Sequence, residues 1–82
     1  MISPQIRISY HIVAERLYRP DRGQYESYAI EGIYHLSTLE TVRYRISDVS
    51  TNREFVEHLV QLYNKQNLQP SYLKADIESR MK

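Results

Sequence analysis

The chain has no cysteine and no tryptophan, only two glycines and three prolines, and no long apolar run. Without cysteine it can form no disulfide, no thiolate metal site and no cysteine nucleophile. With so little glycine, no phosphate-binding loop is expected, and the sequence contains neither a Walker motif nor a dinucleotide-binding motif. No apolar stretch approaches the roughly 20 residues that a helix needs to cross a bilayer, so we expect no membrane segment.

Neither sign of charge is in clear excess, because the formal net charge of the 82 residues is only +1. Residues 1–50 contain arginine but no lysine, and their arginines are matched by acidic residues. A chain without a global basic field is a poor nonspecific binder of nucleic acid. Residues 1–5 show no basic region followed by an apolar core, so we expect no signal peptide and a cytoplasmic location.

What the chain does have is alternation of apolar and polar residues in three tyrosine-rich segments. The apolar residues fall mainly on even numbers: Ile6, Ile8, Tyr10 and Ile12, then Tyr28, Ile30, Tyr34 and Leu36, then Val42, Tyr44 and Ile46. This period of two predicts three strands, at about residues 5–18, 24–36 and 40–47, with one buried face. Gly32 lies in the middle of the second segment and predicts a bend or a close approach by a helix.

Residues 19–23 have the composition of a turn, because Pro20 presets the first corner and Gly23 tolerates positive φ. If Arg19 faces Gln24, even positions of the first strand meet odd positions of the second. The alternation is also interrupted near Ala14. Both observations predict a β-bulge near Ala14 that restores the match of the two apolar faces.

Helical signals follow the third strand. Thr51 and Glu54 have the spacing of a capping box, and an apolar stripe at helical spacing comes after them. Asn67 is a plausible end for this helix, and Pro70 suits the first turn of a second one. Asp48 could in principle be a catalytic carboxylate, but its Asp-x-Ser-Thr context favours a role at the helix start.

These elements predict one α+β domain over residues 1–82, in the order β-β-β-α-α. It would be a three-stranded antiparallel meander followed by two helices packed on one face. The predicted core consists of Ile8, Tyr10, Ile12, Tyr28, Ile30, Tyr44, Ile46, Phe55, Leu59, Leu62, Leu73 and Ile77.

Several short segments between residues 25 and 78 resemble a family of short bacterial proteins of unknown function. Members of that family have a strand with a Ser-Tyr-Gly-Ile-like stretch, an Asp-Ile-Ser-Thr-like helix start, and a helix ending in Asn followed by Leu-x-Pro. The matching residues here are 27–30, with Ala29 at the position of the glycine, then 47–51, and then Asn64, Leu68 and Pro70. The resemblance implies a compact cytoplasmic domain and carries no activity.

Odd positions on the three strands define the face that the helices should leave exposed. The candidate interaction residues on this outer face are Arg7, His11, Glu31, His35, Arg43 and Arg45. His11 and His35 with Glu31 or Glu15 could bind a metal ion, but no histidine spacing supports a site, and we favour two exposed histidines. We therefore predict no metal and no cofactor.

The function predicted from these observations is a small non-enzymatic protein-interaction module, whose partner is another protein or a second copy in a homodimer. A small core, open edge strands and a surface rich in tyrosine and arginine motivate it. The alternative is a weak binder of RNA or single-stranded nucleic acid through Arg7, Arg43 and Arg45. An enzyme is not expected, because no nucleophile–base pair is visible. The sequence does not indicate a small-molecule ligand.

Overall fold

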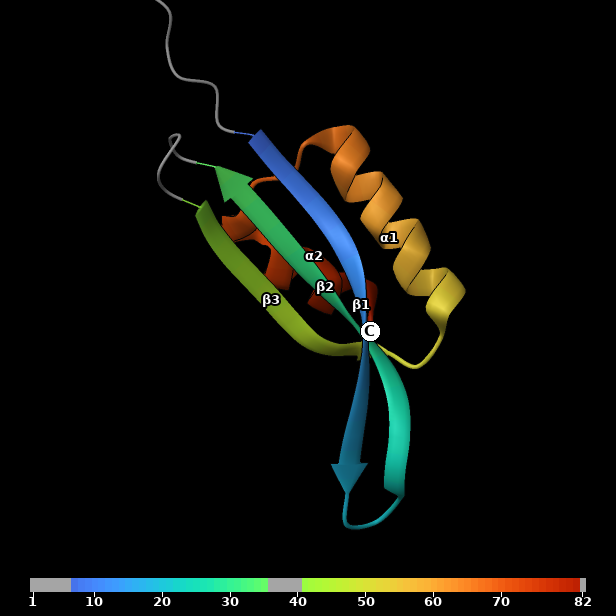
Figure 1. Cartoon of the computed structure of the whole chain (residues 1–82). Coiled ribbons are helices and arrows are strands. Elements are labelled where there is room, and N and C mark those ends of the chain that lie inside the picture. The colour runs from blue at the N-terminus through green and yellow to red at the C-terminus, as the bar shows by residue number, and fades with distance from the viewer. Residues whose placement is uncertain (1–6, 36–40, 82) are drawn as a thin grey trace, which may run out of the picture.

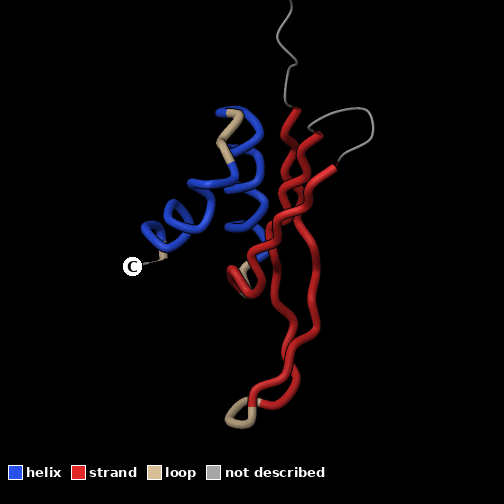
Figure 2. The backbone as a smooth tube through the Cα atoms, turned by 90° about the vertical axis from the view of Figure 1, so that its left-hand side faces the viewer, coloured by secondary structure: helices blue, strands red, loops and turns tan. Residues whose placement is uncertain are grey.

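The computed structural model describes residues 7–35 and 41–81, and it has the predicted α+β architecture. Strands β1 (Arg7–Arg19), β2 (Gly23–His35) and β3 (Thr41–Ser50) form an antiparallel sheet in the order β1-β2-β3 (Figure 1). Helix α1 (Arg53–Gln66), a 3-10 turn (Pro70–Tyr72) and helix α2 (Leu73–Arg80) follow. Both helices lie on the same side of the sheet (Figure 2), so the order β-β-β-α-α is confirmed.

The β1–β2 hairpin keeps one uninterrupted register, and the bulge predicted near Ala14 is wrong. Arg19 faces Gly23 rather than Gln24, because the turn contains only residues 20–22 and is closed by a bond from the Arg22 amide to the Arg19 carbonyl of 3.1 Å. Even positions therefore meet even positions without any insertion. Gly23 takes a φ of 76°, which is the conformation expected for glycine at the end of such a turn.

The irregularity in the sheet lies instead between β2 and β3. Ile30 faces Ile46 but Tyr28 faces Ser50, so β3 has extra residues between those two pairs. Asp48, within this bulge, has a φ of 53°. The odd-numbered Val49, within this bulge, is buried in the core, and β3 extends to Ser50 rather than ending at Ser47.

Tyr10 occupies the centre of the core, opposite Gly32 in the register. Its ring meets that of Tyr63 edge-on, with centroids 5.8 Å apart. A Cβ at Gly32 would lie 2.8 Å from the Tyr10 ring, so the predicted close approach at Gly32 is made by this ring and not by a helix. The buried apolar cluster comprises Tyr10, Ile30, Val49, Val56, Leu59, Tyr63, Leu73 and Ile77.

Two residues of the predicted core are misplaced. Tyr44 is 40% exposed, because it belongs to the edge strand β3, where the helices cover less of the sheet. Leu62 is half-buried and lies outside the buried cluster. The buried face of α1 instead runs through Val56, Leu59 and Tyr63, at i, i+3 and i+7, which places Leu62 on the flank.

The ends of α1 match the sequence in one case and differ in the other. Asn52, not Thr51, caps the start: its side-chain oxygen accepts a hydrogen bond from the Phe55 amide at 3.2 Å. The predicted capping box is therefore wrong, and so is a helix-start role for Asp48, which is a β3 residue. Asn67 ends the helix at a φ of 52°, as predicted.

The second helix also begins as expected, because Pro70 opens the 3-10 turn that leads into α2. Over residues 7–35 and 41–81, neither helix is long and apolar enough to cross a bilayer.

The far end of the β1–β2 hairpin projects well beyond the helices (Figures 1 and 2). We call residues 15–27 the hairpin arm. Most of its side chains are exposed, and Tyr18 is 68% exposed. An isolated two-stranded hairpin is only marginally stable in water, so this arm requires support from outside itself.

Candidate interaction surface

The outer face of the sheet carries the predicted interaction residues. His11, Glu31 and Arg45 form one row across the three strands, since His11 faces Glu31 and Glu31 faces Arg45. Arg7 faces His35 in the register, but its side chain lies outside what the structure describes. The structure thus brings Glu31, Arg43 and Arg45 together, whereas His35 contacts Thr41 through its Nδ1 at 3.2 Å.

The two described arginines of this set are paired with carboxylates. Arg45 donates from Nε and Nη2 to one oxygen of Glu31, at 3.3 and 3.0 Å, and its Nη1 lies 3.7 Å from Glu15. Arg43 Nη1 lies 3.7 Å from the other Glu31 oxygen. Two acidic residues therefore offset two basic ones on this face, which weakens the field that a phosphate backbone would meet.

No metal centre is indicated in the described part of the chain. Within it, no group of three or more histidine, aspartate or glutamate side chains is placed to hold a metal ion. His11 Nε2 lies 3.2 Å from the Ser9 hydroxyl, and His35 is engaged by Thr41. The two histidines therefore have separate neighbours.

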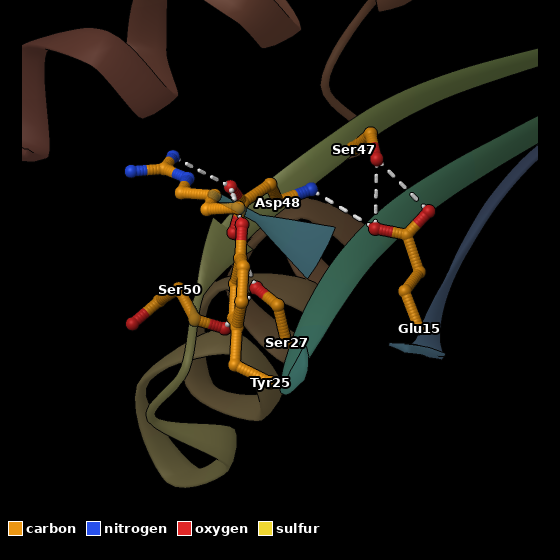
Figure 3. A network of polar contacts seen from close by, with 7 residues as sticks. Glu15, Tyr25, Ser27, Ser47, Asp48 and Ser50 are labelled. Atoms are coloured by element: carbon orange, nitrogen blue, oxygen red, sulfur yellow. Dashed lines mark hydrogen bonds and ion pairs between the residues drawn. The ribbon is translucent and has the colours of Figure 1, made fainter. Parts of the chain in front are cut away.

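A polar network around Asp48 is the feature that sequence reasoning missed (Figure 3). Asp48 accepts hydrogen bonds from the Ser27 hydroxyl at 2.6 Å, the Tyr25 hydroxyl at 2.9 Å and Arg19 Nη2 at 3.1 Å. Its own amide donates to Glu15 at 3.0 Å. All four partners belong to the hairpin arm, so the network joins the arm to the bulge of β3.

The donors around Asp48 also set its charge state. The Ser27 hydroxyl bond lowers the pKa of Asp48 most, and Tyr25 and Arg19 lower it further against the opposing effect of burial. The carboxylate is therefore ionised and fully engaged, as an anchor requires. The missed signal was the break in alternation after Ile46, where polar Asp48 takes an even position and apolar Val49 an odd one.

The two edges of the sheet are treated differently. On the β1 edge, the Asn64 side chain of α1 accepts a bond from the Tyr10 amide at 2.7 Å and donates one to the Tyr10 carbonyl at 3.0 Å. These are the two bonds that a neighbouring strand would make to Tyr10. Helix α1 lies alongside β1 (Figure 1) and so covers this edge at Tyr10.

The position of Asn64 also fixes which backbone groups are free on β3. The amide and carbonyl of Tyr10 point away from β2. Because these backbone groups alternate in an antiparallel ladder, the odd residues of β1 form the hydrogen bonds to β2, and the even residues of β2 form those to β3. The backbone groups of even residues of β3 then face β2, whereas Thr41, Arg43 and Arg45 direct their amides and carbonyls away from the sheet. Among the described residues, none bonds these outward groups.

A cleft of about 360 Å³ runs beside the open β3 edge, between β3 and α2. Its lining is Ile46, Ser47, Asp48, Val49, Ile77, Glu78 and Met81. Met81 is 52% exposed, and Tyr44 projects from β3 on the same side of the sheet. An apolar surface thus lies next to unpaired backbone groups.

A larger cleft, of about 430 Å³, lies near the opposite end of the sheet. It is lined by Ile8, Tyr34, Asn67, Gln69, Pro70 and Ser71, with no acid, histidine or cation in this lining.

Comparison with known proteins adds no further assignment. No protein-family model matches the chain, and no curated protein and no solved structure is detectably similar to it.

Proposed function

We propose that this protein is a non-enzymatic interaction module that binds another protein by adding one of its extended segments to the β3 edge. The observation that carries the proposal is the unequal treatment of the two edges. Asn64 occupies the outward groups of Tyr10 on β1, while the outward groups of Arg43 and Arg45 on β3 meet no partner among the described residues.

An added strand would gain from both features of this edge. Its backbone would pair with the amides and carbonyls of Thr41, Arg43 and Arg45, each bond contributing about 0.5–1.5 kcal/mol net. Its side chains on the helix side would cover Tyr44 and Met81 and exclude water from the cleft. Main-chain bonding for affinity and alternate side chains for specificity are the general mode of strand addition.

The absence of cysteine is compatible with a reducing compartment, and we propose a cytoplasmic location. The resemblance to short bacterial proteins of unknown function stays a prediction.

The test is affinity capture from a native host lysate with the wild type and with Arg43→Pro. Proline removes the outward amide of residue 43 without removing a bond to β2, because proline is tolerated where an edge strand faces solvent. Arg43→Ala is the matched control, since it removes the same side chain and keeps the amide. We expect one specific protein to bind the wild type, to be retained more weakly by the alanine variant, and to be lost with proline.

Nuclease treatment separates the alternative function. Recovery of nucleic acid that is lost after nuclease treatment and at raised salt would replace the present proposal with binding of RNA or single-stranded DNA through the arginines. A protein retained equally by the wild type and by a folded Arg43→Pro variant would contradict binding at the β3 edge.

A further inference from the structure

We propose that the segment added at β3 carries carboxylates at alternate positions, opposite Arg43 and Arg45, and apolar side chains between them. This inference rests on the proposed function and names the chemistry of the partner. The recognised feature would be an extended segment of another protein, acidic on the outer face of the sheet and apolar on the helix side.

Arg43 and Arg45 favour a binding segment with acidic side chains. Their side chains are 70% and 47% exposed, whereas their carboxylate partner Glu31 is only 13% exposed. A strand added to β3 would lie about 4.8 Å from it and about twice that distance from β2. Its side chains would therefore meet the arginines first, and Glu31 only across the intervening strand.

The bonds to Glu31 do not exhaust the two arginines. A guanidinium carries five N–H donors, and Arg45 uses two of them for Glu31. Carboxylates directly opposite on the added strand would take the remaining donors, and opposite charges at such cross-strand positions are favourable.

The helix side of the same edge selects apolar residues. Tyr44 projects there between the two arginines, and the cleft beside it contains Ile46, Ile77 and Met81. Glu78 is also in the lining of this cleft. A carboxylate on this side of the ligand would meet it as a like charge, so the acidic positions belong on the outer face alone.

A second copy of this chain is a poor occupant of the β3 edge. In antiparallel self-pairing, odd residues of one β3 face odd residues of the other. The registers that pair five or more residues of 41–47 set Arg43 against Arg43, Arg43 against Arg45, or Arg45 against Arg45. Like charges directly opposite are destabilising, so the edge favours a different, acidic chain.

The experiment uses three eight-residue capped peptides that alternate valine with glutamate, with lysine or with threonine. Binding to the full chain is measured by fluorescence anisotropy and by amide shifts of residues 41–46 in NMR. We expect the glutamate peptide to bind about tenfold more tightly than the lysine peptide, because two cross-strand charge pairs change sign. With Arg43→Ala and Arg45→Ala combined, the preference should fall to within about twofold.

A second measurement avoids any dependence on a variant that fails to fold. Two further glutamate peptides are N-methylated, one at the glutamates and one at the valines. A strand presents only every second amide to its neighbour. We expect methylation at the glutamates, which sit opposite the outward-facing residues, to abolish binding, and methylation at the valines to leave it nearly unchanged.

The outcomes separate this inference from the proposed function. Equal binding of all three peptides, lost on glutamate methylation, would overturn the acidic selection and leave strand addition intact. Binding that survives both methylations, or shifts confined to residues outside 41–46, would overturn strand addition itself. Absence of binding by the glutamate peptide would overturn the acidic inference, while the lysate comparison would still judge the function. A dimer that competes with the peptide would identify a second copy as the occupant and contradict the proposal.

Discussion

The two ends of the β1–β2 hairpin are held in different ways. At the packed end, Tyr10 and Ile30 are buried beneath the helices within one apolar cluster. At the other end, the hairpin arm projects beyond the helices. It is joined to β3 by hydrogen bonds that Asp48 accepts from the arm and by one that Ser47 donates to Glu15 of the arm (Figure 3). The same pair of strands is thus stabilised by removal of apolar surface from water at one end and by a polar network at the other.

A small domain can therefore extend a strand pair beyond its core if one residue accepts hydrogen bonds from several donors. Ser27 is fully buried and would be costly without a partner, and Asp48 supplies that partner. Apolar packing should dominate total stability, whereas the network should govern the local order of the arm.

The largest effect is expected from Leu59→Ala at the packed end. Leu59 is nearly fully buried between α1 and the sheet, so its truncation should lower the free energy of unfolding by about 2–5 kcal/mol. Urea denaturation measures the loss. Leu62→Ala is the matched control on the flank of the same helix and should cost clearly less. Equal losses would contradict the observed orientation of α1.

A smaller and more local effect is expected from Asp48→Asn. Asparagine keeps the shape and tolerates positive φ, but it cannot accept from all three donors as a carboxylate does. We expect the free energy of unfolding to fall by about 1–3 kcal/mol. Amide hydrogen exchange in residues 15–27 should accelerate more than exchange around Tyr10.

Asp21→Asn is the control for this experiment, because Asp21 is an exposed residue of the turn in the same arm. Uniform acceleration across the sheet, or an equal effect of the control, would show that Asp48 does not anchor the arm specifically.

Substitutions at the N-terminal cap of α1 should change the free energy of unfolding less than Leu59→Ala. Asn52→Ala should cost about 1 kcal/mol, since it removes the acceptor for the Phe55 amide. Thr51→Ala should change the melting temperature little. The reverse order would restore the capping box that the sequence predicts and contradict the observed helix start.

The smallest effect concerns the pH dependence of stability. It involves two carboxylates, Asp48 of β3 and Asp76 of α2. The Ser27 bond lowers the pKa of Asp48, and the Tyr63 hydroxyl bond lowers that of Asp76. A lowered folded pKa contributes stability that is complete above the unfolded value of about 3.9 and is lost as pH falls through the folded value. Stability should therefore be flat with respect to these groups above about pH 5 and decline on further acidification.

The variants Asp48→Asn and Asp76→Asn divide this decline between the polar network of the hairpin arm and the helices that cover the sheet. Each should make the acid side of the stability profile shallower, and urea denaturation from pH 2 to pH 6 measures it. A profile unchanged by either substitution would mean that neither carboxylate is engaged in solution.

Local patterns predicted the parts of this protein that depend on neighbours in sequence. Alternation of apolar residues predicted three strands, and Asn67 and Pro70 correctly marked the junction of the helices. The bulge was predicted on the wrong strand, because the register of β1 and β2 depends on whether Arg19 faces Gly23 or Gln24. A difference of one residue in a turn decides that question, and composition allows both.

The candidate site shows the same division. Odd positions correctly predicted that Glu31, Arg43 and Arg45 share a face, because a strand alternates its side chains regardless of its neighbours. The pairing of these charges could not be read from that pattern, since it depends on the order of the strands. Nothing in the sequence around Asn64 indicates that its side chain would close the β1 edge at Tyr10, which lies 54 residues away.

The fold class, the apolar face of the sheet and the small net charge can be read from the amino-acid sequence alone, since these follow from residue types and their period. The edge that α1 covers, the position of the bulge and the donors around Asp48 depend on how the chain packs in three dimensions. These features join residues distant in the chain, and their partners are selected by register and packing rather than by local preference.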